Sequence, residues 1–218
     1  MSALIRYSFA TMLHSQRYVA PVLLFMGIVG VLSSNDAGPL APVYATCAAA
    51  MFVCATWLTI ALISVDDSTH RAITVVSAGN SVRVLSATVA VAALSCLVLA
   101  VAGLVFPLLV GEHTVTALAL FVGTEAQLTC AAAGIAIGLI CSRLVMRRQG
   151  YSVIVALALI MIALLVPGLA PVNAMFKLMS TVTEPTELLV PVSGFLAIAL
   201  VLLTVSAIAT QCLTTRRD

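Results

Sequence analysis

The sequence predicts an all-α polytopic membrane protein with six transmembrane helices, an N-terminal amphipathic interfacial helix, and cytoplasmic N and C termini. Three observations predict this fold: the composition, six apolar runs of spanning length, and basic residues that gather on one side. Hydrophobic residues make up 62% of the 218 residues, charged residues make up 8%, and the mean hydropathy is +1.21. A soluble domain carries about 25% charged residues because its surface meets water. We therefore expect lipid to surround most of this chain.

Six apolar runs are long enough to cross the hydrocarbon core, which takes about 17–25 residues in a helix. They are residues 18–34, 43–65, 84–106, 120–142, 151–170 and 190–212. Each run is expected to be a helix, because lipid cannot hydrogen-bond an unpaired backbone. The third run stops before Pro107, and a longer outer segment, 171–189, separates the last two. The chain is thus predicted to be one transmembrane domain, residues 1–218.

Residues 1–17 are predicted to form the interfacial helix, since their polarity alternates with a helical period. The apolar half of the helix holds Leu4, Ile5, Phe9, Met12 and Leu13. The polar half holds Arg6, Ala10, His14 and Arg17. Apolar side chains would enter the acyl boundary while the arginines meet anionic headgroups of the membrane lipids. The alternative is a cytoplasmic extension of the first span with no separate role.

Nine of the ten basic residues fall on one side of the predicted spans, and the positive-inside rule makes that side cytoplasmic. These nine are Arg6, Arg17, Arg71, Arg83, Arg143, Arg147, Arg148, Arg216 and Arg217. Lys177 alone lies on the outer side. Tyr18 and Tyr151 at inner ends and Tyr44 at an outer end fit interfacial aromatic belts. We expect a multi-pass protein of the cell's inner or plasma membrane.

The longest cytoplasmic loop, residues 66–83, has the pattern of a docking surface. Asp66 and Asp67 stand where a short helix would begin, and carboxylates suit the positive end of a helix. A small apolar patch holds Ile73, Val75 and Val76. Residues 78–81 are a turn signal before the third span. An apolar patch on a loop suggests binding of a soluble partner; the alternative is a purely structural connector.

Glu125 and Trp57 are the candidates for a translocation path inside the membrane. Glu125 is an ionisable side chain in a predicted span, and burying a charge there costs at least about 2.5 kcal/mol. It faces a cavity, or it lies at the outer headgroup level, which the nearby Thr124 and Gln127 favour. Trp57 lies within a span rather than at an aromatic belt, so it lines a pore or packs in the core.

Small residues within the spans suggest packing roles. Gly134 and Gly138 form a G-x-x-x-G pair, which permits close approach of two helices. The six cysteines all lie in apolar runs without metal-site spacing, so we expect packing residues, no metal site and no disulfides. They are Cys47, Cys54, Cys96, Cys130, Cys141 and Cys212.

The order of these elements resembles the permease subunit of a type-2 ABC transporter, in the exporter superfamily. The resemblance is carried by residues 6–18 before the first span and by the acidic-then-basic loop that runs from Asp66 to Leu85. In that family a coupling helix after the second span rests in a groove of the ATPase subunit. The resemblance therefore implies ATPase coupling for Asp66, Asp67, His70, Arg71, Val75, Val76, Gly79, Asn80 and Arg83.

The resemblance also implies the partners. A second permease subunit, identical or paralogous, would pair with this one, and two copies of an ABC ATPase subunit would drive export between them. The sequence contains no G-x-x-x-x-G-K-[ST] phosphate loop, and six spans leave no room for a nucleotide-binding domain. We therefore expect a non-catalytic subunit that binds no cofactor, with ATP and Mg on the partner ATPase.

Other classes of function remain open on the sequence alone. One is a six-span secondary transporter or substrate-binding membrane component without a dedicated ATPase, although such carriers place several polar groups near the midplane. Another is a non-transporting membrane scaffold or immunity protein. Catalytic motifs such as G-x-S-x-G and H-E-x-x-H do not occur, and the net charge of +2 without a basic run argues against nucleic-acid binding. The transported substrate is not encoded in any recognisable motif.

Overall fold

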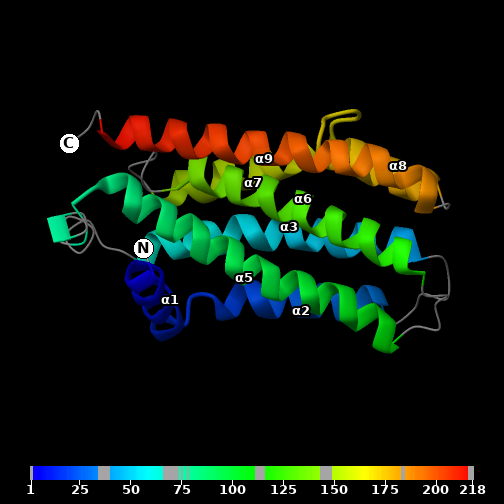
Figure 1. Cartoon of the computed structure of the whole chain (residues 1–218), viewed down its shortest axis with the longest axis horizontal. Helices are drawn as coiled ribbons and strands as arrows, with labels where there is room; N and C mark the ends of the chain where they lie inside the picture. The colour runs from blue at the N-terminus through cyan, green and yellow to red at the C-terminus, as the bar shows by residue number, and fades with distance from the viewer. Residues whose placement is uncertain are drawn as a thin grey trace.

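A computed structural model describes residues 2–33, 40–65, 74, 76–77, 79–110, 116–142, 149–182 and 185–215. These residues are helical throughout apart from short turns, and no strand occurs among them. The elements are α1 (Ser2–Ser15), α2 (Val19–Ser33), α3 (Leu40–Val65), α5 (Ser81–Val110), α6 (Ala117–Ile140), α7 (Gln149–Leu165), α8 (Val172–Thr181) and α9 (Pro185–Thr215). The long helices lie roughly side by side in one bundle, and α1 crosses one end of it (Figure 1).

Four helices in the described part of the chain are long and apolar enough to cross a membrane: α3, α5, α6 and α9. A fifth span results if α1 and α2, which are bent by 76° relative to each other, count as one. Tyr151–Leu165 of α7 is apolar but shorter. Each of the six predicted runs coincides with one helix. The all-α class and the presence of several candidate membrane spans are therefore confirmed.

Most helix boundaries differ from the predicted ones by a few residues, and three of the differences have a local cause. α5 continues through Pro107 to Val110, because a proline one turn before a helix end disrupts few backbone hydrogen bonds. α7 ends at Leu165 rather than residue 170, since Pro167 and the left-handed Gly168 (φ +78°) follow it. The outer segment 171–189 contains a separate helix, α8, and the first turn of α9.

The start of α9 explains part of this difference. Pro185 occupies its first position, where the missing N–H has no intrahelical partner in any case. Glu187 in the first turn meets the positive end of the helix dipole. Both features favour a helix that begins before the apolar run, so hydropathy alone placed the start too late.

The centre of the bundle is α6, which packs against α3 on one side and α9 on the other. Gly134 and Gly138 of α6 lie directly on α3. A Cβ atom on Gly134 would be 2.7 Å from the backbone oxygen of Phe52, and one on Gly138 would be 2.6 Å from the Cβ of Thr59. Neither site has space for a side chain. The expectation that this glycine pair permits close helix approach is confirmed.

The chain direction alternates in the bundle. α3, α6 and α9 all begin at one end, and both chain termini lie at the other end (Figure 1). We call these the opposite end and the termini end. The parallel direction of α3 and α6 agrees with their contacts, since Gly134 meets Ala55 and Gly138 meets Thr59 further along both chains.

A valine at position 134 should weaken the α3–α6 contact. The added side chain must displace the α3 backbone, and overpacking of this kind costs about 1–3 kcal/mol. We expect Gly134→Val to lower the free energy of unfolding in an SDS titration of the purified protein by that amount. Gly194→Val is the matched control, because a Cβ at Gly194 of α9 meets nothing within 4 Å. An equal loss in both variants would contradict a special role for the glycine pair.

Candidate functional site

The ATPase-coupling residues predicted from the sequence lie partly outside the described residues. This is the case for Asp66, Asp67, His70, Arg71 and Val75. The remaining four, Val76, Gly79, Asn80 and Arg83, lie immediately before α5 and in its first turn. α5 begins at the termini end of the bundle (Figure 1).

Gly79 and Asn80 build the turn that leads into α5. Gly79 has a φ of +70°, a conformation that glycine adopts without strain, and its N–H donates to the backbone oxygen of Val76 at 3.3 Å. The Oδ1 atom of Asn80 accepts a hydrogen bond from the N–H of Val82 at 2.9 Å, which caps the first turn of α5. These two residues are structural. They hold an exposed Val76 (81% accessible) and an exposed Arg83 at the bundle end.

Arg17 links the α1–α2 elbow to the end of α3. Its Nη1 atom donates to the backbone oxygen of Ser64 at 3.0 Å and to the Ser64 hydroxyl at 3.1 Å. A cation suits the negative end of a helix, and Ser64 is the penultimate residue of α3. Arg17 thus fixes the point from which residues 66–83 depart. The sequence suggested only a headgroup contact for Arg17, because no local signal links residues 47 positions apart.

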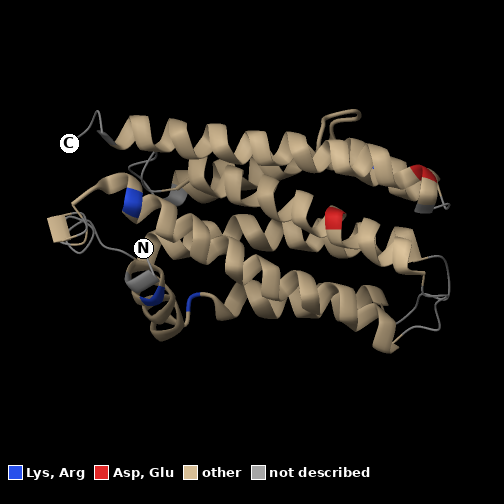
Figure 2. Cartoon of the chain, viewed as in Figure 1, with Lys and Arg blue, Asp and Glu red and all other residues tan. Residues whose placement is uncertain are grey.

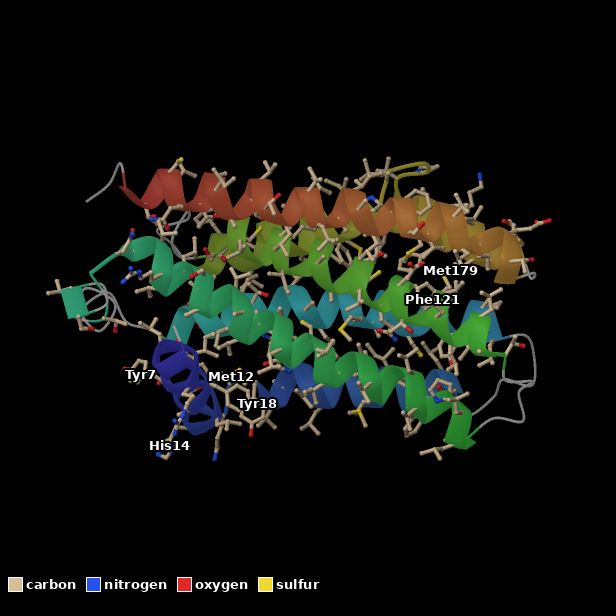
Figure 3. The ribbon with its side chains drawn as sticks, viewed as in Figure 1. Tyr7, Met12, His14, Tyr18, Phe121 and Met179 are labelled. Carbon is tan, nitrogen blue, oxygen red and sulfur yellow. The ribbon has the colours of Figure 1, made fainter. Side chains whose placement is uncertain are left out.

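α1 packs on the bundle with part of its apolar half. Met12 is buried, and its sulfur accepts a hydrogen bond from the hydroxyl of Ser95 in α5 at 3.7 Å. Figure 3 shows Met12 turned toward the bundle, with Tyr7 and His14 turned away from it. Leu13, predicted to share the face of Met12, is exposed. The face buried against protein is therefore narrower than the predicted apolar half.

One face of α3 is left uncovered by the described residues. Its only exposed side chains are Thr46 and Trp57, and Trp57 is 45% accessible. The two are eleven residues apart, about three helical turns, so they lie on one face. Trp57 is two residues from both Ala55 and Thr59, which contact α6, so it points away from α6. The alternative of a packed core tryptophan is wrong. We call this side of α3 the bare face.

An open groove with a volume of about 540 Å³ lies beside the bare face toward the opposite end. α3 contributes Thr46 and Ala49, the end of α7 contributes Leu164, and α8 contributes Phe176 and Lys177. This volume falls within the range of roughly 300–1,000 Å³ found for small-molecule sites. The apolar runs of the sequence do not indicate the groove, because one of its walls is α8, which is too short and too polar to stand out as a span.

Asn173 of α8 fixes the turn that closes the groove. Its Nδ2 atom donates to the backbone oxygen of Leu164 at 2.6 Å, and its Oδ1 accepts from the N–H of Gly168 at 3.1 Å. The side chain therefore joins the end of α7 to α8. Buried Met175 and Met179 anchor the other face of α8 (Figure 3 labels Met179). α8, which forms one wall of the groove, is therefore fixed by Asn173 on one face and by the two buried methionines on the other.

The structure does not bring Glu125 and Trp57 together. Glu125 is two residues from both Gly123, which contacts α3, and Gln127, which contacts α5. At about 100° per residue, the Glu125 side chain leaves α6 on the side opposite its contacts with α3 and α5. The Trp57 side chain leaves α3 on the side that faces away from α6. Glu125 lies eight residues into α6, about 12 Å along its axis. Its Oε2 atom is buried and has no hydrogen-bond partner among the residues described.

Two polar residues that suggested the membrane interface are in fact core residues. Gln127 is fully buried, and neither amide atom has a partner in the described part of the chain. Tyr44, expected in an aromatic belt, is also fully buried, and its ring lies on Gly123, 2.5 Å from where a Cβ would be. Neither residue therefore marks a headgroup level, and the interfacial alternative for Glu125 loses the support that Gln127 gave it.

Removal of the Arg17 side chain should loosen the end of α3. A hydrogen bond from a charged donor contributes about 1.5–3 kcal/mol, less where water competes, so we expect Arg17→Ala to accelerate amide hydrogen exchange in the last turn of α3 by about tenfold. Arg6→Ala removes an exposed arginine from α1 and is the matched control. Mass spectrometry of peptides that cover residues 58–65 gives the readout. Equal exchange in the two variants would show that the Arg17–Ser64 contact does not hold this turn.

Comparison with known proteins identifies no relative of this chain. No family model matches it, and neither the curated proteins nor the solved structures give a match.

Proposed function

We propose that this chain is the membrane-spanning permease subunit of an ATP-driven ABC exporter. It pairs with a second permease copy and couples to a separate ATPase through residues 66–83. One observation carries this proposal: a capped, glycine-containing turn holds the exposed apolar side chain of Val76 at the termini end of the bundle. Together with Ile73 and Val75, which the sequence places beside it, this side chain supports an apolar docking patch for a soluble partner.

The proposed topology has six spans, formed by α2, α3, α5, α6, α7 and α9. Basic residues of α1, of the α1–α2 elbow and of the first turn of α5 share the termini end (Figure 2). The positive-inside rule then assigns the termini to the cytoplasm of a cell inner or plasma membrane. α2 has 15 residues and α7 has 17, which is short for a span, and local thinning of the bilayer accommodates such a mismatch.

In this proposal the second permease copy covers the bare face of α3 and the exposed side of α7. α7 makes its main contacts with α8 and α6 and leaves Val153, Leu157 and Met161 exposed. Substrate moves between the two copies, so Trp57 belongs to the translocation path. Glu125 points to another side of the bundle and is left outside the path. ATP and Mg bind to the partner ATPase, and this chain supplies the docking loop.

One observation favours an ion-coupled secondary transporter as the second candidate. One oxygen of the half-buried Glu125 side chain, Oε2, is buried and has no partner among the described residues, as the ligand of a coupling ion would be. However, Gln127 faces another side of α6, so the two side chains do not converge on one site. A single carboxylate gives a proton or sodium ion few ligands, and for this reason we rank the carrier below the exporter.

Purification of the tagged protein in a mild detergent should recover an ATPase subunit. Val76→Asp should reduce this recovery more than about tenfold, because an unpaired charge at a buried interface costs about 2–5 kcal/mol. Thr214→Asp, at the termini end but outside the loop, is the matched control and should not change recovery. Recovery of the permease alone, or an equal amount of ATPase with Val76→Asp, would refute docking through this loop.

Charge reversal of Asp67 or Arg71 should lower transport-coupled ATP hydrolysis and leave membrane insertion intact, because the proposed loop lies outside the lipid. Unchanged coupling in both variants would contradict the assignment of this loop.

The orientation can be tested with single introduced cysteines at exposed positions. Ser180→Cys lies on α8 and Ser77→Cys lies beside the turn before α5. A membrane-impermeant maleimide should label position 180 in intact cells and position 77 only after permeabilisation. Labelling of the parent protein under the same conditions gives the background from the native cysteines. The reverse pattern would place the docking loop outside the cell and refute the exporter proposal.

A further inference from the structure

We propose that the groove between α3, α7 and α8 binds a single-chain amphipathic anion, a fatty-acyl carboxylate. Its head group lies at Lys177, and its chain follows the bare face of α3 toward Trp57. The inference rests on the proposed function only in treating this ligand as the exported cargo. Binding itself requires the groove alone.

Lys177 supplies the charge that selects an anion. It lines the groove on the exposed side of α8, and no described residue forms an ion pair with it. The acidic residues in the described part of the chain are Glu125 and Glu187, and neither lines the groove. Among the described residues the ammonium group is therefore a positive charge without an acidic partner beside an apolar surface, which suits an anionic head group on an apolar chain.

The other polar groups in the groove are already engaged. The Thr46 hydroxyl donates to the backbone oxygen of Val43 at 2.7 Å, and the Ser180 hydroxyl donates to that of Lys177 at 2.9 Å. Asn173 is held by the α7–α8 turn. Lys177 is thus the charged donor of the groove, and beside it the described side chains leave only the second N–H of the Asn173 amide. This matches a head group with one negative charge rather than a polyhydroxylated or zwitterionic one.

The remaining lining suits an acyl chain. The small side chains of Ala45 and Ala49 on α3 form the floor of the groove and leave space for a ligand, while Leu164 and Phe176 form apolar walls. Beyond Ala49, the bare face continues through Val53 to Trp57, about 12 Å further along α3. A long acyl chain anchored at Lys177 would therefore extend along α3 toward the indole ring.

Trp57 is the only tryptophan in the chain, so its fluorescence reports directly on this surface. The full-length protein in detergent is titrated with dibromostearic acid, whose bromines quench a contacted indole. We expect saturable quenching. The neutral dibromostearyl alcohol, which has the same chain without the charge, should quench only weakly and without saturation. Equal curves for the acid and the alcohol would indicate simple partition into the micelle and would overturn the proposal.

Two variants test the two halves of the site separately. Lys177→Gln should weaken the apparent affinity for dibromostearic acid by about tenfold, the equivalent of 1.4 kcal/mol, while Lys177→Arg should retain it. Thr46→Phe fills the groove at an exposed position and should abolish the saturable component although Lys177 is unchanged. Unaltered binding in Lys177→Gln or in Thr46→Phe would overturn the assignment. Saturable, Lys177-dependent quenching by dibrominated phosphatidylcholine would identify a bilayer lipid instead and would also overturn it.

The same preparations separate this inference from the proposed function. ATPase co-purification without saturable quenching would refute the carboxylate site and leave the exporter intact. Saturable, Lys177-dependent quenching without an ATPase would support the site and remove its interpretation as an export path.

Discussion

The contact between α3 and α6 is the constraint on which the rest of the structure depends. Between lipid-embedded helices no hydrophobic effect drives association, because lipid is as apolar as the side chains it would release. Close packing must replace it, and Gly134 and Gly138 permit that packing by bringing the α6 backbone onto Phe52 and Thr59. α9, α5 and α2 then pack around this pair.

This arrangement separates two kinds of surface along α3. At the termini end, Ser64 is held by Arg17, next to the residues proposed to dock an ATPase. Toward the opposite end, the bare face and α8 form the groove that contains Lys177. A single well-packed helix thus joins the proposed motor contact to the proposed ligand site. The length of α3 itself sets the separation of the two.

The sequence predicts the helices well and their packing poorly, for a physical reason. Apolar runs located every long helix, because spanning length and hydropathy are local properties. In a bilayer, however, a side chain that faces lipid and one that faces protein are equally apolar, so hydropathy cannot distinguish them. For the same reason hydropathy allows Trp57 in the core although it is exposed. Polarity suggests interfaces for Tyr44 and Gln127 although both are buried in the bundle.

The Arg17–Ser64 link depends on a tertiary contact that no local pattern records. α8 has a local signal, the helical spacing of Val172, Met175 and Met179, which a search for long apolar runs does not detect.

Gln127 and Gly103 form a pair whose identities constrain each other. A Cβ on Gly103 would lie 2.7 Å from the Nε2 atom of Gln127 and 3.0 Å from the ring of Phe25. Even alanine at position 103 therefore requires a shorter side chain at 127 or a displaced one. Homologous chains should show this as covariation, with glycine at the first position wherever glutamine occupies the second. A side chain can therefore enter position 103 only after or together with a change at position 127, whereas position 127 can change first.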